Sequence, residues 1–269
     1  MQGYIRIIRP LNCFLAGTLV VIGIIITGKL DTVTMTIAFS VAFLITGAGN
    51  TINDYFDIEI DKINNPERPI PSGEIKEKHA LMLAILLFLA GIGISLKLTF
   101  ICIIIAVFNS ALLIFYSYKL KRKGFIGNLS ISYLGASTLI FGGASVEKFT
   151  VPFILSLLAF FSTLSRELIK DIEDIHGDRC FASTLPLLIG EEKTSLIASL
   201  FLAFSVLLSP LPYFLNIFGI RYLILVFIAD LVFLYSILIL LTGGPETAGK
   251  VSSYLKLGMI IAVIAFLFG

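Results

Sequence analysis

The feature that most constrains this chain is the recurrence of long apolar runs, which are separated by short polar breaks and fill almost all of its 269 residues. Runs of this kind can cross roughly 30 Å of hydrocarbon as helices. In lipid, only helices and closed barrels satisfy the backbone hydrogen bonds, and these runs lack the alternation of a barrel. With 57% hydrophobic and 14% charged residues, the chain is predicted to be an all-α, polytopic protein embedded in the lipid bilayer.

About nine spans can be distinguished, so we expect a bundle of about nine transmembrane helices. No proline- or serine-rich linker and no low-complexity segment divides the chain, so we expect a single domain over residues 1–269. The predicted spans cover residues 11–26, 33–52, 80–96, 100–118, 126–144, 151–169, 196–218, 222–241 and 254–268.

The positions of the basic residues predict the orientation, because cytoplasmic loops carry an excess of Lys and Arg. With a cytoplasmic N-terminus, 16 of the 20 Lys and Arg residues fall on the inside. Only Lys29, Lys97, Lys148 and Arg221 remain outside. We therefore expect a multi-pass protein of the cell membrane with its N-terminus in the cytoplasm and its C-terminus outside. The net charge is only +2, and we expect no nucleic-acid partner.

A first acidic cluster follows the second span. Asn53, Asp57 and Asp61 stand at i, i+4 and i+8, so a continuing helix places them on one face, over a rise of about 12 Å. Like charges at this spacing destabilise a helix. Acidic groups stacked in this way are therefore expected chiefly where cations neutralise them. A set of oxygen ligands suits Mg²⁺, which completes its shell with water and substrate phosphate.

A second acidic cluster follows the sixth span. Asp171, Asp174 and Asp178 stand at i, i+3 and i+7, again on one helical face, with Lys170 and Arg179 beside them. This mixture suits a metal–diphosphate complex, in which carboxylates bind the metal and cations meet the remaining phosphate oxygens.

Either cluster alone could be a solvated helix end that anchors its span at the membrane surface. Two clusters with helical ligand spacing, both continuing a span on the same predicted side, favour a functional site. The calcium-binding EF-hand pattern is absent from both segments. A cation transporter is disfavoured because its coupling charges lie near the bilayer midplane, whereas these aspartates lie at helix ends.

Basic residues near the clusters are candidates for phosphate binding. Arg68 lies in the segment 64–73, whose prolines and terminal glycine predict a rigid turn. Lys119 and Lys121 follow the fourth span within a run of four cations. Anchoring of the span at the membrane surface would also explain that run.

The pairing of the two motifs, Asn53-Asp54-x-x-Asp57-x-x-x-Asp61 and Lys170-Asp171-x-x-Asp174-x-x-x-Asp178, resembles the UbiA superfamily of intramembrane prenyltransferases over nearly the whole chain. The resemblance implies a nine-helix bundle around a central cavity, with Mg²⁺ and a prenyl diphosphate bound by the two motifs. It implies catalytic roles for Asp57, Asp61, Asp171 and Asp174. The metal ligands that it implies are Asn53, Asp57, Asp61, Asp171, Asp174 and Asp178, and the substrate-binding residues are Asn53, Arg68, Lys119, Lys121 and Lys170.

Three local phrases, at residues 9–13, 68–73 and 166–174, resemble an archaeal group within this superfamily that makes ether lipids, the digeranylgeranylglyceryl phosphate synthases. That resemblance implies transfer of a geranylgeranyl group from geranylgeranyl diphosphate to the free hydroxyl of geranylgeranylglyceryl phosphate. The alternative is an aromatic prenyltransferase of quinone biosynthesis, acting on a 4-hydroxybenzoate-type acceptor at the same donor site. The CDP-alcohol phosphotransferase signature is absent. The base that removes the acceptor proton, a motif carboxylate or pyrophosphate itself, stays open.

Overall fold

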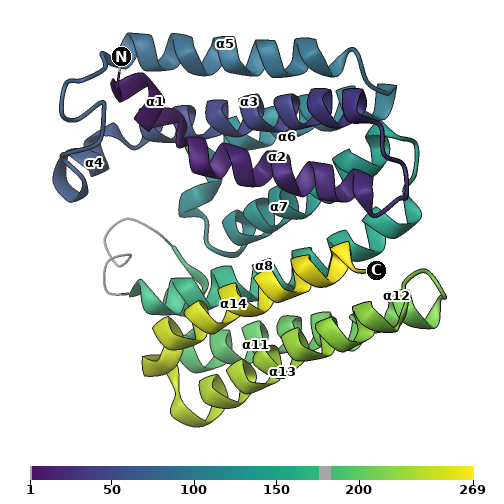
Figure 1. Cartoon of the computed structure of the whole chain (residues 1–269). Helices are drawn as coiled ribbons and strands as arrows, with labels where there is room; N and C mark the ends of the chain where they lie inside the picture. Colours follow the sequence, from purple (N-terminus) through teal and green to yellow (C-terminus); the bar gives the residue numbers. More distant parts are fainter. Residues whose placement is uncertain (1, 176–182) are drawn as a thin grey trace. The chain divides into compact units, whose positions relative to one another are not determined.

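The computed structural model describes residues 2–175 and 183–269, and every regular element within these ranges is a helix (Figure 1). The chain forms two compact units. Unit 1 comprises residues 1–119 and 137–149, and unit 2 comprises residues 120–136 and 150–269. The prediction of an all-α chain is confirmed, whereas the single domain over residues 1–269 stays a prediction.

In unit 1, the long helix α3 is central and packs against α1, α2, α5 and α6 (Figure 1). Its core side chains include Val41, Ile45 and Ala48, which join Phe88 of α5 and Phe141 of α7 in one buried cluster. The elements of this unit are α1 (Gln2–Ile8), α2 (Pro10–Ile25), α3 (Thr32–Phe56), α4 (Ile58–Asn64), α5 (Glu77–Ser95), α6 (Phe100–Tyr118) and the C-terminal part of α7 (Phe125–Ser145).

In unit 2, α8 packs against α11 and α14, and α13 packs against α11 and α14 (Figure 1). Leu168 and Ile169 of α8, Leu202 of α11 and Leu255 of α14 are almost completely buried in its core. The elements are η1 (Leu120–Arg122), the first part of α7, α8 (Thr150–Glu173), α10 (Leu185–Ile189), α11 (Glu191–Leu208), α12 (Leu211–Phe214), α13 (Ile220–Gly243), η2 (Pro245–Thr247) and α14 (Ala248–Leu267).

The number of spans agrees with the expectation. Among the described residues, eight helical segments are long and apolar enough to cross a membrane, and a bent pair, α1 with α2, makes up to nine. Most helices begin and end within a few residues of the predicted runs. The clearest difference is the predicted span 196–218, in which α11 ends at Leu208 and the short α12 follows from Leu211. Pro210 and Pro212 lack the amide hydrogens needed to continue a regular helix.

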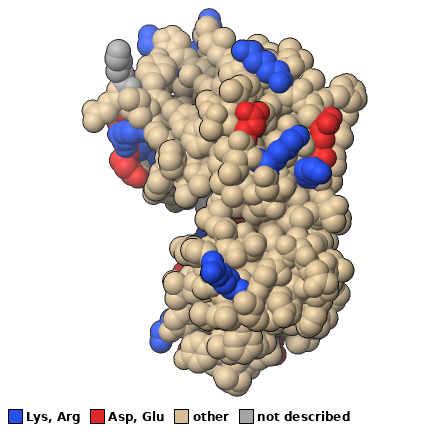
Figure 2. Space-filling view, turned by 45° about the vertical axis from the view of Figure 1, so that its right-hand side comes forward, with Lys and Arg blue, Asp and Glu red and all other residues tan. Residues whose placement is uncertain are grey.

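The surface of both units is largely apolar. Leu30, Phe100, Leu207 and Phe214 each expose more than 70% of their area, although they are among the most hydrophobic residue types. The face drawn in Figure 2 is mostly uncharged, with Lys, Arg, Asp and Glu confined to scattered positions. Apolar exposure on this scale is typical of a surface that faces lipid. The chain is therefore an integral membrane protein.

Candidate functional site

The first acidic cluster lies where α3 passes into α4. Helix α3 ends at Phe56, Asp57 forms the junction with φ −93° and ψ 4°, and α4 begins at Ile58. The helical hydrogen bonds continue through the junction, because the amide of Asp57 donates to the carbonyl of Asn53 over 3.0 Å and that of Asp61 donates to the carbonyl of Asp57 over 2.8 Å. The predicted spacing of i, i+4 and i+8 therefore places these three residues in succession along one helical path.

Amide side chains position two of the carboxylates along this path. The Asn53 side-chain amide donates to Asp57 Oδ2 over 3.0 Å. One turn beyond Asp61, the Asn65 side chain donates to Asp61 Oδ1 over 3.2 Å. Asp57 and Asp61 are each only 3% exposed. The fold thus buries carboxylate oxygens at the end of a membrane-spanning helix, at positions set by neutral hydrogen-bond donors.

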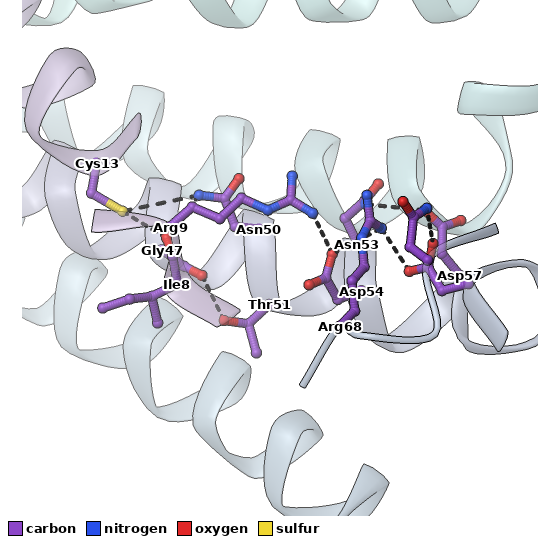
Figure 3. Close-up of polar contacts among 12 residues, drawn as sticks. Ile8, Arg9, Cys13, Gly47, Asn50, Thr51, Asn53, Asp54, Asp57 and Arg68 are labelled. Carbon is purple, nitrogen blue, oxygen red and sulfur yellow. Dashed lines mark hydrogen bonds and ion pairs between the residues drawn. The ribbon is translucent and has the colours of Figure 1, made fainter. Parts of the chain in front are cut away.

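Asp54 joins two arginines to this cluster (Figure 3). It is 3% exposed, and its Oδ1 lies 2.5 Å from Arg9 Nη2 and 3.6 Å from Arg68 Nη1. The same Arg68 nitrogen lies 2.6 Å from Asp61 Oδ2. Because a buried carboxylate is costly unless it is paired, Arg9 and Arg68 stabilise Asp54, and Arg68 also stabilises Asp61. Arg9 and Arg68 keep about a third of their side-chain area exposed.

A break between α1 and α2 brings Arg9 to Asp54. Arg9 adopts the left-handed conformation with φ 51° and ψ 72°, Pro10 follows, and the two helix axes bend by 44°. The Ile8 carbonyl at this break accepts hydrogen bonds from the Asn50 amide over 2.9 Å and from Cys13 Sγ over 3.0 Å (Figure 3). Since left-handed backbone is strained for a residue other than glycine, the surrounding contacts must hold it in place.

The turn that carries Arg68 is well anchored, as the sequence predicted. The amide of Ile75 donates to the carbonyl of Pro69 over 2.9 Å, and Gly73 supplies the positive φ of 80° that the turn requires. Ile70 and Ile75 are buried in a small apolar cluster with Ile7 of α1. A fixed turn lowers the entropy cost of ligand binding by the residues that it carries.

Lys119 also lies near the first cluster. It directly follows α6, whose last residue, Tyr118, packs its ring against that of Phe56 with the centroids 5.5 Å apart. Phe56 immediately precedes Asp57. The aromatic contact therefore brings the C-terminal end of α6, and the exposed Lys119, to the same end of unit 1 as the acidic residues.

The second cluster lies at the C-terminal end of α8. Asp171 is within the helix, and Asp174 directly follows it, with its amide donating to the carbonyl of Lys170 over 2.9 Å. Asp171 is half-buried, whereas Lys170 and Asp174 are exposed. These two aspartates thus have the helical spacing that the sequence predicted. The third predicted ligand of this cluster, Asp178, lies outside the described residues.

One contact connects the second cluster to the start of α7, and another ties the segment before α10 to η1. The buried side-chain amide of Asn128 donates to Asp171 Oδ2 over 2.7 Å. The amide of Ser183 donates to the carbonyl of Arg122 over 3.1 Å, which ties η1, where Lys121 lies, to the segment before α10. Gly124 permits this approach, because it has a positive φ of 48° and a Cβ there would lie 2.3 Å from the Ser183 carbonyl oxygen. Lys121 itself is exposed.

The donor chemistry of these residues fits a magnesium ion bound together with a phosphate group. Asn53, Asp57 and Asp61 supply oxygen donors, and cationic side chains stand beside them. Mg²⁺ commonly takes only one or two carboxylates and completes its shell with water and phosphate oxygens. Within the described ranges, no group of three or more His, Cys, Asp or Glu residues is arranged to hold a metal ion by itself.

Sequence reasoning missed several residues that the structure brings into this region. The sequence shows Asp54 only as a member of the first motif, and Arg9 only as the first residue of the phrase at residues 9–13. Asn65 stands at i+4 from Asp61, so extending the helical stripe by one turn would have found it. Asn128 gave a weaker signal, a carboxamide within an apolar span that the chain must satisfy by hydrogen bonding.

The fold and the two clusters define a polytopic helical membrane protein with acidic sites suited to a metal and an anion. The model of the UbiA prenyltransferase family matches residues 14–262. The chain therefore belongs to the UbiA prenyltransferase family.

Relatives within this family match the chain over its full length. A digeranylgeranylglyceryl phosphate synthase of Methanosphaera stadtmanae is 42% identical, with 100% of this chain and 99% of the relative aligned. A protein of the same name from Methanosarcina mazei is 43% identical, with 100% of this chain and 98% of the relative aligned. The aligned regions thus extend over both acidic clusters and all the predicted spans.

Solved structures give the same result. A structure of a digeranylgeranylglyceryl phosphate synthase has a TM-score of 0.91 and 41% identity, covering 100% of this chain and 97% of the other. A UbiA homologue from Archaeoglobus fulgidus, solved with DMAPP and Mg²⁺, has a TM-score of 0.71 and 17% identity, covering 97% and 99% of the two chains. At that identity, the second likeness shows a shared fold.

Proposed function

We propose that this chain transfers a geranylgeranyl group from geranylgeranyl diphosphate to the free hydroxyl of geranylgeranylglyceryl phosphate, in a Mg²⁺-dependent step of archaeal ether-lipid synthesis. The observation that carries the proposal is the identity of 42–43% with digeranylgeranylglyceryl phosphate synthases over the entire chain. The aromatic prenyltransferase of quinone biosynthesis is not favoured, because these full-length relatives carry the ether-lipid name.

We assign donor binding to the two acidic clusters. Asn53, Asp57 and Asp61 in unit 1, and Asp171, Asp174 and Asp178 in the second motif, are the proposed ligands of Mg²⁺. Arg68, Lys119, Lys121 and Lys170 are proposed to donate to phosphate oxygens that the metal leaves free. Such charge-assisted hydrogen bonds are stronger than neutral ones. The planar guanidinium group of Arg can also donate two parallel hydrogen bonds to the oxygens of one phosphate.

The proposed chemistry needs these residues for charge stabilisation. Bound Mg²⁺ supplies Lewis-acid neutralisation of the negative charge that develops on the departing diphosphate. The Arg68 and lysine side chains donate hydrogen bonds to the diphosphate oxygens that the metal leaves free, and the position of Arg68 is set before the substrate arrives. In unit 1, Asp54 holds Arg9 and Arg68 in place. The apolar helices exclude water from the reactive allylic carbon.

We further propose that the N-terminus and both clusters face the cytoplasm and that the C-terminus lies outside. The support is the unequal distribution of Lys and Arg along the sequence. Labelling of single cysteines by a membrane-impermeant reagent in right-side-out vesicles tests this orientation. A cysteine added after residue 269 should react, and one placed at Lys62 should not.

Product analysis tests the function. Purified protein in detergent is incubated with Mg²⁺, geranylgeranyl diphosphate and either geranylgeranylglyceryl phosphate or 4-hydroxybenzoate, and the products are identified by mass spectrometry. A doubly alkylated glyceryl phosphate that disappears with a chelator and returns with added Mg²⁺ is the expected result. Prenylated hydroxybenzoate as the main product would contradict the proposal and move the chain to quinone synthesis.

A further inference from the structure

One further acidic side chain, Glu167, lies one turn before the second cluster in α8. The helix is unbroken from Thr150 to Glu173, so Glu167, Asp171 and Asp174 stand at i, i+4 and i+7 on one face. Four residues of α-helix rise about 6 Å. Glu167 therefore continues the stripe of metal-binding candidates by one turn towards the middle of a candidate membrane span.

Glu167 forms an ion pair within this span. Its Oε1 lies 2.7 Å from Arg166 Nη1, and each side chain is 20% exposed. Charged groups inside a membrane are expensive and mark functional sites by default. Arg166 offsets part of that cost by pairing with the carboxylate. A carboxylate at this depth is able to accept a proton.

Stability alone is a poor explanation for this pair. Burying an ion pair usually gives no more stability than packing apolar side chains of similar volume. Arg166 Nε is also buried and has no hydrogen-bond partner within the described residues. Polar atoms buried for structural reasons are nearly always satisfied. The pair therefore lacks the complete hydrogen bonding expected of a structural bridge.

Glu167 lies at the depth in the membrane span at which the acceptor hydroxyl must react. If Asp171 and Asp174 bind the diphosphate end of the donor, its isoprenoid tail extends away from them among the apolar helices. The reactive C1 is the first carbon beyond the diphosphate, so the attacking hydroxyl arrives just inside the cluster. Glu167 lies at this level on the same helix face. Asp171 is already engaged by a hydrogen bond from Asn128.

We propose that Glu167 is the general base that removes the proton of the acceptor hydroxyl, an inference that rests on the proposed function. The hydroxyl oxygen forms a bond to C1, the C1–O bond to the diphosphate breaks with its electron pair leaving on the diphosphate, and the hydroxyl proton passes to the Glu167 carboxylate. Atoms and charge balance without any further reactant. The acceptor class is an aliphatic alcohol, whose hydroxyl is a weak nucleophile until a base takes its proton.

The test compares Glu167→Gln with a matched control, Glu173→Gln, on the same helix. Glu173 is exposed, and it stands roughly 100–160° around the helix from the three residues of the stripe. Two quantities are measured for the wild type and both variants: kcat for the alkylated glyceryl phosphate, and the Kd of a non-ionising thiolo analogue of geranylgeranyl diphosphate in the presence of Mg²⁺. Glu167→Asp serves as a conservative variant that keeps the carboxylate.

A general base predicts that Glu167→Gln lowers kcat by about 10²–10⁴-fold, while the Kd for the donor analogue keeps the wild-type value. Glu173→Gln should match the wild type in both, and Glu167→Asp should recover part of the lost rate. Wild-type kcat in Glu167→Gln would overturn the inference. A joint loss of kcat and donor affinity would also overturn it, because Glu167 would then serve the donor site or the fold. A wild-type protein inactive towards this acceptor would instead contradict the proposed function.

Discussion

The two acidic clusters differ in how the fold holds them. In unit 1, Asp54, Asp57 and Asp61 are each 3% exposed, and two arginines contact the set. In unit 2, Asp171 is half-buried and Asp174 is exposed. Removing a buried, paired carboxylate leaves its partners unsatisfied, whereas removing an exposed one affects the fold little. The first cluster therefore combines a structural role with its proposed functional one. Changes in the second cluster are expected to affect the proposed function with less effect on the fold.

The largest expected effect is a loss of activity without a loss of stability when the second cluster is changed. Asp174→Ala should lower kcat by about 10³-fold, because loss of a metal ligand removes several kcal/mol of charge stabilisation in the transition state. Its thermal unfolding in detergent should match that of the wild type, since the side chain is exposed. Steady-state kinetics and differential scanning fluorimetry measure the two quantities. Retained activity would remove Asp174 from the site.

The matching change in unit 1 should affect stability. Asp54→Asn replaces the carboxylate shared by Arg9 and Arg68, and we expect the free energy of unfolding to fall by about 1–3 kcal/mol. The two arginines are partly exposed and regain water, which limits the loss. Denaturation in detergent measures this change, with Asp174→Asn as the matched control. Equal stability of the two variants would remove the contrast between the clusters.

An intermediate effect is expected from the hydrogen bond that orients Asp171. Asn128→Ala removes its donor at 2.7 Å, and loss of a group that orients a metal ligand typically costs 10–100-fold in metal affinity or activity. The concentration of Mg²⁺ that gives half-maximal rate should rise accordingly. Asn109→Ala, in another span, is the control. An unchanged magnesium dependence in Asn128→Ala would show that this contact does not serve metal binding.

The smallest effects are expected from the exposed lysines. Lys119→Ala and Lys121→Ala should each raise KM for the donor by about fivefold, equivalent to about 1 kcal/mol, because exposed charges are screened by solvent. Lys148→Ala, on the predicted outer side, provides the control. Donor titrations at constant Mg²⁺ give these values. A lysine variant with wild-type KM would leave that residue with only an anchoring role at the membrane surface.

Much of the fold could be predicted because only helices and closed barrels satisfy the backbone hydrogen bonds in lipid. Apolar length alone located helices such as Phe100–Tyr118, which matches its predicted range. The stripe of Asn53, Asp57 and Asp61 also followed from helical periodicity. Breaks within spans were harder to predict. The interruption after Leu208 depends on the positions of individual prolines. Mean hydropathy over a long window does not detect single prolines.

The contacts around the clusters could not be predicted in the same way. Arg9 reaches Asp54 only because the chain bends by 44° at Pro10 and other groups satisfy the freed Ile8 carbonyl. Asn128 reaches Asp171 from 43 residues away in the sequence. Such pairings depend on tertiary packing, and periodicity within one helix carries no information about them.

The central claim, that both clusters bind the donor through Mg²⁺, is tested most directly by donor binding. The Kd of the thiolo analogue of geranylgeranyl diphosphate is measured with and without Mg²⁺ for the wild type, Asp57→Asn and Asp174→Asn. The account predicts that Mg²⁺ tightens binding to the wild type and that each substitution alone removes most of this gain. Wild-type magnesium-dependent affinity in either variant would contradict it, because donor binding would then depend on one cluster only.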